Sequence, residues 1–252
     1  MLFNAAWCSD GAQKCARTPF FKVGFTFMKK LNVKAWLGLI FLATAMGLLI
    51  FVSAGTLRYW QGWVYLAVFF GASMLITHYL IRKDPALLKR RLSSGPTAEK
   101  EKTQKIIMLF ASVGFIALLI VSALDYHFGW SAVPPYAVVT GDILVAAGFY
   151  IIFLVYKENT FTSATIEIAE GQKVITTGPY ALVRHPMYAG GLLYLFGTPL
   201  ALGSYWGFLA LAAMTPFLIW RLFDEEWFLS KNLPGYREYC AQVRWRLIPG
   251  LF

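Results

Sequence analysis

The sequence is poor in charged residues and in cysteine. Charged residues make up 14% of the chain, against about a quarter in an average soluble domain, while 58% of the residues are hydrophobic and 17% are aromatic. The three cysteines, Cys8, Cys15 and Cys240, have no spacing typical of a zinc site and are too few for a disulfide framework. These shortages exclude an ordinary soluble domain and predict that the protein binds no metal.

Acidic residues are scarcer than basic ones, and the net charge is +10. Of the 23 Lys and Arg, six lie in 1–34, eight in 82–105, three in 157–186 and five in 221–252, which leaves Arg58. Clusters between apolar stretches are typical of the positive-inside distribution of membrane proteins. The basic charge therefore indicates membrane topology and attraction of 82–105 to anionic membrane lipid. It does not indicate nucleic acid as a partner.

Long apolar runs fill most of the remaining sequence, and several approach the roughly 20 residues that span a bilayer. The predicted fold is an all-α integral membrane protein with five to six transmembrane helices and a C-terminal helical hairpin. The count stays open because the first hairpin arm is short and contains Pro199. With six spans, both termini are cytoplasmic. The predicted spans are 35–57, 62–81, 106–124 and 137–156, followed by hairpin arms at 187–203 and 204–222.

The domain organisation predicted from these spans is simple. Residues 1–34 form an N-terminal extension that is dispensable up to residue 27, and 35–252 form a single membrane domain. Within it, 160–178 alternates around a glycine and predicts a small β-hairpin or an extended lid.

Two short helices are also expected outside the spans. Pro85 follows Asp84 and predicts the start of an interfacial helix. In the tail, Tyr236, Tyr239 and Cys240 recur at helical spacing, which predicts a helix between Pro234-Gly235 and Pro249-Gly250.

The foot of the C-terminal hairpin gathers polar residues where a helix is expected to begin. Pro186 is suited to the first helical position, so the amides after His185 favour an anion, and Arg184 adds a fixed positive charge. Gly190 and Gly191 either let a ligand approach the backbone or serve helix packing.

Two carboxylates follow the returning arm of the hairpin. Glu225 and Glu226 either pair with Arg221 or Arg184 as they leave the bilayer, or form a binding site with Arg184 and His185. A ligand with both a carboxylate and a cationic centre suits such a surface. An amino acid with a sulfonium group is one example, because nearby aromatic rings can hold its cation.

These residues together carry a resemblance to a known family. The segments Gly178-Pro-Tyr180, Val183-Arg-His-Pro-Met-Tyr-Ala-Gly190, Glu225-Glu226, Gly235-Tyr-Arg-Glu-Tyr239 and Arg246-Leu-Ile-Pro-Gly250 resemble the isoprenylcysteine carboxyl methyltransferase family. Phospholipid N-methyltransferases and methanethiol S-methyltransferases are related to that family. The resemblance implies methyl transfer from S-adenosylmethionine to a lipophilic or small-molecule acceptor. It also implies a cofactor site built from about 157–252 and reached from the cytosol.

The resemblance also implies residue roles. Arg184, His185 and Glu226 are expected to be catalytic, and an amine acceptor would lose its proton to Glu226 or His185. A thiol or carboxylate acceptor needs no strong base, so the acceptor stays open. The cofactor-binding residues implied are Tyr180, Arg184, His185, Tyr188, Gly190, Glu225, Glu226, Tyr236 and Tyr239.

Two other functions remain as alternatives. A membrane sterol or enone reductase that uses NADPH resembles the same C-terminal half, but such enzymes tend to have Asn at Met187 and an acidic residue at Gly191. A scaffold or transporter would use the charged hairpin foot structurally. Transporters often carry paired broken helices in two halves, and this sequence has one irregular hairpin without a repeat.

Overall fold

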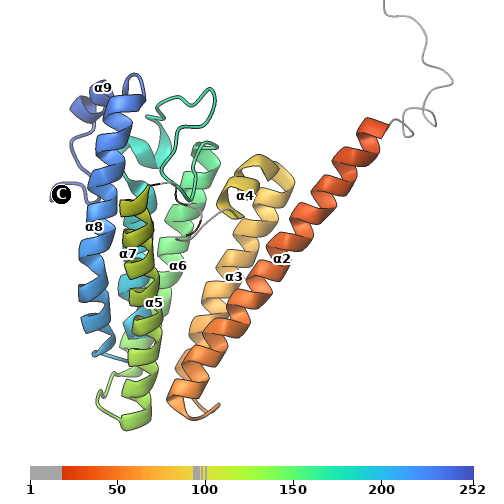
Figure 1. Ribbon diagram of the computed structural model, residues 1–252. Coiled ribbons are helices and arrows are strands. Elements are labelled where there is room, and N and C mark those ends of the chain that lie inside the picture. The colour runs from red at the N-terminus through yellow and green to blue at the C-terminus, as the bar shows by residue number, and fades with distance from the viewer. Residues whose placement is uncertain (1–18, 93–96, 98, 100) are drawn as a thin grey trace, which may run out of the picture. The chain divides into compact units, whose positions relative to one another are not determined.

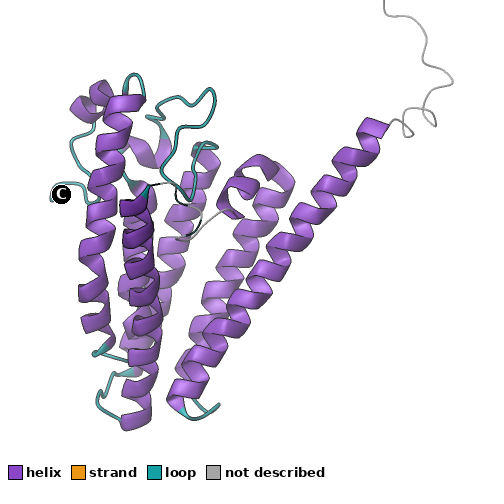
Figure 2. Ribbon diagram, in the orientation of Figure 1, coloured by secondary structure: helices purple, strands orange, loops and turns teal. Residues whose placement is uncertain are grey.

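The computed structural model describes residues 19–92, 97, 99 and 101–252, and their regular structure is helical (Figure 1, Figure 2). No strand occurs among these described residues, so the all-α prediction is confirmed. The elements are α2 (Pro19–Ala54), α3 (Trp60–Lys83), α4 (Pro85–Leu92), α5 (Lys102–Phe128), α6 (Pro135–Glu158), the 3-10 turn η1 (Gly178–Ala181), α7 (Pro186–Ala201), α8 (Gly207–Asn232) and α9 (Tyr236–Gln242).

The chain divides into two compact units, Met1–Gly38 and Leu39–Phe252. The described part of the first unit, 19–38, is helical and belongs to α2. Most of the predicted dispensable extension, residues 1–18, lies outside the described residues. The second unit contains the rest of α2 and all the later elements.

Among the residues that the structure describes, five helices are long and apolar enough to cross a membrane, which fits a multi-pass membrane protein. Helix α7 is the short arm of the predicted hairpin: its 16 residues rise about 24 Å, less than the hydrocarbon core of about 30 Å. Pro199 lies in its last turn. The candidate spans are Lys30–Ala54, Trp60–Lys83, Lys102–Phe128, Pro135–Glu158 and Gly207–Asn232.

Local capping explains where two of the predicted elements begin and end. The Asp84 carboxylate accepts a hydrogen bond from the Leu87 amide at 2.8 Å, which starts α4 as expected. Helix α6 ends at Glu158, and the Asn159 amide closes it on the carbonyl of Val155 at 2.8 Å.

Helices α6 and α7 pack backbone to backbone along a seam of glycines. A Cβ on Gly148 would lie 2.5 Å from the Gly190 carbonyl oxygen, and a Cβ on Gly197 would lie 2.6 Å from that of Gly141. The glycines are seven residues apart on each helix, so the two contacts fix one antiparallel register. Close approach of small residues is a common way to join membrane helices.

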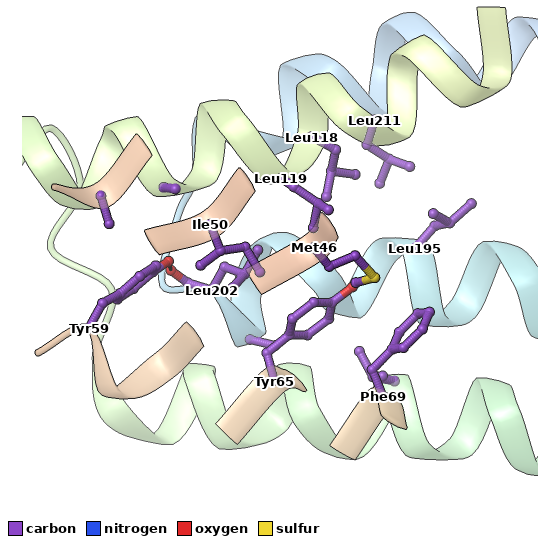
Figure 3. Close-up of a cluster of buried hydrophobic side chains, with 14 of the residues drawn as sticks. Met46, Ile50, Tyr59, Tyr65, Phe69, Leu118, Leu119, Leu195, Leu202 and Leu211 are labelled. Atoms are coloured by element: carbon purple, nitrogen blue, oxygen red, sulfur yellow. Dashed lines mark hydrogen bonds between the residues drawn. The ribbon is translucent and has the colours of Figure 1, made fainter. Parts of the chain in front are cut away.

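A buried apolar cluster fills the second unit between its helices. Met46, Tyr65 and Leu118 come from α2, α3 and α5, while Leu195 and Leu211 come from α7 and α8. Figure 3 shows these side chains converging from their separate helices. Their packing positions α7 and α8 beside α5.

At one end of the helices, a buried carboxylate joins two loops. Asp125 accepts hydrogen bonds from the Ser131 amide and hydroxyl, both at 2.7 Å, and from the Ser204 hydroxyl at 2.5 Å. The amide of Trp206 lies 3.4 Å from the same carboxylate. Nearby, the Tyr59 hydroxyl donates to the Leu202 carbonyl. We call this region the closed end.

Two sequence predictions need correction at the other end. The segment 160–178 forms no β-hairpin and is an irregular loop, which is the extended alternative. Its carbonyls are bound by arginines in place of a partner strand: Arg91 donates to Ser163 at 2.7 Å and Arg221 to Ala164 at 2.9 Å. Arg90 donates to the carbonyl of Thr160 in the same way.

The tail helix is also shorter than predicted. Helix α9 ends at Gln242, well before Pro249, and Val243 is extended. The reason is a competing pairing, because the Trp245 and Arg246 carbonyls accept hydrogen bonds from the amides of Arg184 and His185, each at 2.9 Å. A helical tail could not present those carbonyls to the hairpin foot.

Candidate functional site

The candidate site lies where α6 ends and α7 begins, below the loop and α9 drawn at the top of Figure 1. Pro186 is the first residue of α7 and His185 precedes it as the N-cap, as the sequence predicts. Because the amides of Arg184 and His185 are bound to the tail, these two side chains are held at the helix start.

Glu226 is the centre of a partly buried charge cluster. One carboxylate oxygen binds Arg184 Nη1, and the other accepts from Arg246 Nε at 2.9 Å. His185 Nε2 lies 3.7 Å from the first oxygen, beyond hydrogen-bonding distance. The side chains of Arg184 and Glu226 are 11% and 12% exposed, so the pair is screened less than a surface pair. The predicted meeting of the hairpin foot and the Glu pair is therefore present.

Glu225 has a different environment from its neighbour. Its carboxylate accepts a hydrogen bond from the Tyr188 hydroxyl at 2.6 Å. Tyr188 lies in the first turn of α7 and Glu225 near the end of α8, so this bond joins the two hairpin arms. No described cation forms an ion pair with Glu225.

Three tyrosines from η1 and α9 stand beside these charges. The Tyr239 hydroxyl donates to the Tyr180 carbonyl at 2.8 Å, and Asn159 Nδ2 donates to the Tyr180 hydroxyl at 2.9 Å. Burial raises the pKa of each of Tyr180, Tyr236 and Tyr239 above the ordinary tyrosine value. Their hydroxyls are therefore neutral at physiological pH and act as hydrogen-bonding groups.

A cavity of about 570 Å³ opens among these residues, within the range typical of small-molecule sites. It extends from the tyrosines and charges into the apolar space between α5, α7 and α8. Seven of the nine predicted cofactor residues line it, namely Tyr180, Arg184, His185, Tyr188, Glu225, Tyr236 and Tyr239.

The other two predicted residues are not among the lining residues. Glu226 does not line the cavity but forms an ion pair with Arg184, which does. Gly190 packs against α6, where its Cβ would lie 2.8 Å from the Gly148 carbonyl oxygen. Gly191, the next residue, lines the cavity instead.

Three lining residues carry buried polar atoms without a hydrogen-bond partner. These atoms are Arg184 Nε, His185 Nε2 and the Tyr236 hydroxyl. Buried polar groups are usually paired, and leaving one unpaired costs about 1–3 kcal/mol. Three such atoms around one cavity fit a polar ligand that bonds to them.

Arg221 is a lining residue that sequence reasoning did not place in the site. It is 8% exposed, and it binds Glu99 at 2.7 Å and Gln104 at 2.8 Å as well as the loop carbonyl of Ala164. One sequence signal could have found it, because a residue four positions before Glu225 lies on the same helix face. Of the two partners predicted for the Glu pair, Arg184 forms the ion pair, with Glu226, whereas Arg221 pairs with Glu99.

Comparison with known proteins finds a family match that overlaps much of this region. Residues 136–234 match the Phospholipid methyltransferase family. The resemblance to membrane methyltransferases that the motifs carry is thereby confirmed at the level of this wider family. The matched segment runs from the start of α6 to just past α8, and so includes the hairpin foot and the Glu pair.

The chain is also similar to a curated reductase. Over 91 residues it is 31% identical to Delta(14)-sterol reductase TM7SF2 of Mus musculus. This match covers 35% of the present chain and 22% of the reductase, so the chain spans about a fifth of that relative's length. The family match supports a membrane methyltransferase over the reductase alternative, while the apolar helices fit a membrane protein of either kind.

Proposed function

We propose that this protein is an integral membrane methyltransferase that transfers a methyl group from S-adenosylmethionine to a lipophilic or small-molecule acceptor. The observation that carries the proposal is the cavity itself, where unpaired Arg184 Nε, His185 Nε2 and Tyr236 hydroxyl meet the carboxylate of Glu225. Cationic donors suit the cofactor's carboxylate, and Glu225 suits its ammonium group. The excess of Lys and Arg outside the spans supports a cytoplasmic position for this end.

S-adenosylmethionine supplies an electrophilic methyl group on a sulfonium and leaves as S-adenosylhomocysteine. The protein's part is to bind and orient, since an in-line displacement depends on alignment and on exclusion of water. Arg184 and Tyr236 bind polar ends of the cofactor, and Tyr180 and Tyr239 enclose it. His185 Nε2 is the group placed to take a proton from an amine acceptor. A thiolate or carboxylate acceptor would leave His185 as a hydrogen-bond donor.

The two glutamates divide the work in this proposal. Glu225 contacts the ligand because it lines the cavity, whereas Glu226 fixes the orientation of Arg184 through their ion pair. Glu226 is therefore a positioning residue, and the catalytic role expected for it passes to the groups that it orients.

Calorimetric titration with S-adenosylhomocysteine tests the proposal, with purified protein in nanodiscs. We expect saturable binding by the wild type and at least about 30-fold weaker binding by Glu225→Gln, because a ligand ammonium loses its charged partner. Glu238→Gln is the matched control, since Glu238 is an exposed acid on α9 that does not line the cavity. A folded wild type that binds no S-adenosylhomocysteine would exclude the proposal.

A second candidate is an NADPH-dependent sterol or enone reductase, favoured by the similarity to the mouse Delta(14)-sterol reductase. The same titration with NADPH distinguishes the two. Saturable NADPH binding without S-adenosylhomocysteine binding would establish the reductase, and the converse result supports the transferase.

A further inference from the structure

We infer that the apolar end of the cavity limits the length of the acceptor's chain, and that Met214 closes the cavity at that end. This inference rests on the proposed function, because it concerns the acceptor of the same site. The charged level of the cavity holds Arg221, Glu225 and Tyr188. Beyond that level, toward the middle of the helices, the cavity continues as an apolar space.

The walls of this space come from three helices and are apolar apart from the hydroxyls of Ser112 and Tyr194. On α5 the lining residues recur at i, i+3, i+4 and i+7, which is one helix face. The single hydroxyl among them, that of Ser112, donates to its own helix at the Met108 carbonyl, 2.7 Å away. The walls are Met108, Ala111, Ser112, Phe115 and Ile116 from α5, Leu192, Tyr194 and Leu195 from α7, and Leu218 and Met214 from α8.

Met214 closes the space where the buried core begins. It is 2% exposed and belongs to the same cluster as Leu195 and Leu211. On α5 it faces Gly114, whose Cβ would lie 2.7 Å from Met214 Cβ. Since α5 has no side chain at that point, the methionine side chain alone fills the gap. Figure 3 shows Leu118, Leu195 and Leu211 packed together in this core.

The spacing on α8 sets the length of chain that fits. Arg221 and Met214 are seven residues apart, a rise of about 10 Å. An extended chain advances about 3.5 Å over three bonds, so this depth holds about nine bonds. A single chain of that length fills the space, and the two long chains of a diacyl lipid do not fit inside it.

Chain-length dependence of binding tests the inference. The probes are straight-chain carboxylic acids of about four to fourteen carbons, titrated in nanodiscs with and without saturating S-adenosylhomocysteine. Each methylene should increase affinity about fourfold up to a plateau near nine carbons, because burial of one methylene is worth about 0.8 kcal/mol. Partition into protein-free nanodiscs, measured in parallel, rises without such a plateau and is subtracted.

Two variants move the plateau in opposite directions. Met214→Ala should extend it by about three carbons, the length of the side chain beyond Cβ, while Leu218→Phe should shorten it. Leu119→Ala is the matched control, because Leu119 is fully buried but does not line the cavity. It should lower stability and leave the plateau unchanged.

The possible outcomes separate the two proposals. Affinity that rises through the whole series would mean that the chain leaves the helices beside Ile116, a lining residue that is 43% exposed, and that Met214 does not close the cavity. A plateau that stays at the same chain length in Met214→Ala would also overturn the inference that Met214 closes the cavity. If the wild type binds no S-adenosylhomocysteine but its affinity for the acids still reaches a plateau with chain length, the transferase would be refuted and the chain-length site would stand.

Discussion

Two carboxylates at opposite ends of the second unit show how differently a membrane protein can use a buried acid. Asp125 at the closed end is fully buried and is bound by neutral donors from two loops. Glu226 at the site end is bound by Arg184 and Arg246. The neutral donors around Asp125 lie on short loops and border no described cavity, so their role is structural: they join these loops to α5. Of the two cations around Glu226, Arg184 lines a cavity, and its buried Nε has no hydrogen-bond partner.

The contrast teaches that the donors around a buried acid distinguish the two uses better than its burial does. An acid satisfied by serines and amides needs no further partner. An acid bound to two arginines neutralises only one of their two positive charges, and the remaining positive charge favours an anionic ligand. Substitutions at the two ends should therefore separate stability from binding.

The largest effect is expected from Arg184→Ala at the site end. Removing the guanidinium takes away the proposed partner of a ligand carboxylate and leaves Glu226 with Arg246 alone. Because loss of one partner from a buried charged contact costs about 2–5 kcal/mol, S-adenosylhomocysteine affinity should fall by about 30-fold to several thousand-fold. Calorimetry measures this, with the thermal unfolding midpoint checked on the same sample. Unchanged affinity would remove Arg184 from the binding site.

Asp125→Ala should break the closed end alone. The Ser131 and Ser204 groups would lose their acceptor, and each buried group left unpaired costs about 1–3 kcal/mol, so a loss of about 3 kcal/mol in unfolding free energy is expected. Thermal or denaturant unfolding in detergent measures it. S-adenosylhomocysteine affinity of the folded variant should equal that of the wild type. A large loss of affinity would contradict the separation of the two ends.

Gly190→Ala tests a residue that connects the two ends through the α6–α7 seam. The new methyl group would lie 2.8 Å from the Gly148 carbonyl oxygen, and such overpacking costs about 1–3 kcal/mol. The unfolding midpoint should fall, and affinity should change only as far as α7 shifts. Gly191→Ala is the control, since its Cβ meets nothing nearer than 4.0 Å. Equal stability of the two variants would argue against the seam.

The smallest effect is expected from Tyr239→Phe. The variant loses the hydrogen bond to the Tyr180 carbonyl at 2.8 Å, worth about 1 kcal/mol, together with the longer contact to the Val183 carbonyl at 3.4 Å, and keeps the ring packed beside Tyr236. Burial raises the pKa of Tyr239, so its hydroxyl keeps its proton. The difference in unfolding free energy between the variant and the wild type should therefore be constant between pH 6 and pH 9. A difference that vanished within this range would show that a charged tyrosine is involved.

The sequence alone predicted the helices and the charged hairpin foot from local signals, and the family resemblance implied the other residues that meet at the cavity. Apolar length marks a span, and Pro186 after His185 marks a helix start. It did not predict that the tail would bind the hairpin foot, since the carbonyls of Trp245 and Arg246 carry no side-chain signal. The same holds for the arginines that bind carbonyls of the loop after α6.

The roles of the glycines and of the two glutamates were also beyond sequence reasoning. Gly190 and Gly191 are adjacent and chemically identical, but successive residues of a helix point about 100° apart. One therefore packs against α6 while the other lines the cavity. Glu225 and Glu226 differ in the same way, and only the rotation of α8 decides which carboxylate lines the cavity.

The register fixed by the glycine seam has a consequence for where water and lipid meet. Pairing Gly148 with Gly190 and Gly141 with Gly197 sets Pro186 level with Ile152, six residues before α6 ends at Glu158. Helix α7 therefore begins about 9 Å short of the end of α6, measured along the helix axis. Under the proposed function, a solute arriving from water would descend this depth before it reached the start of α7, and a lipid tail would not have to leave the bilayer to meet it.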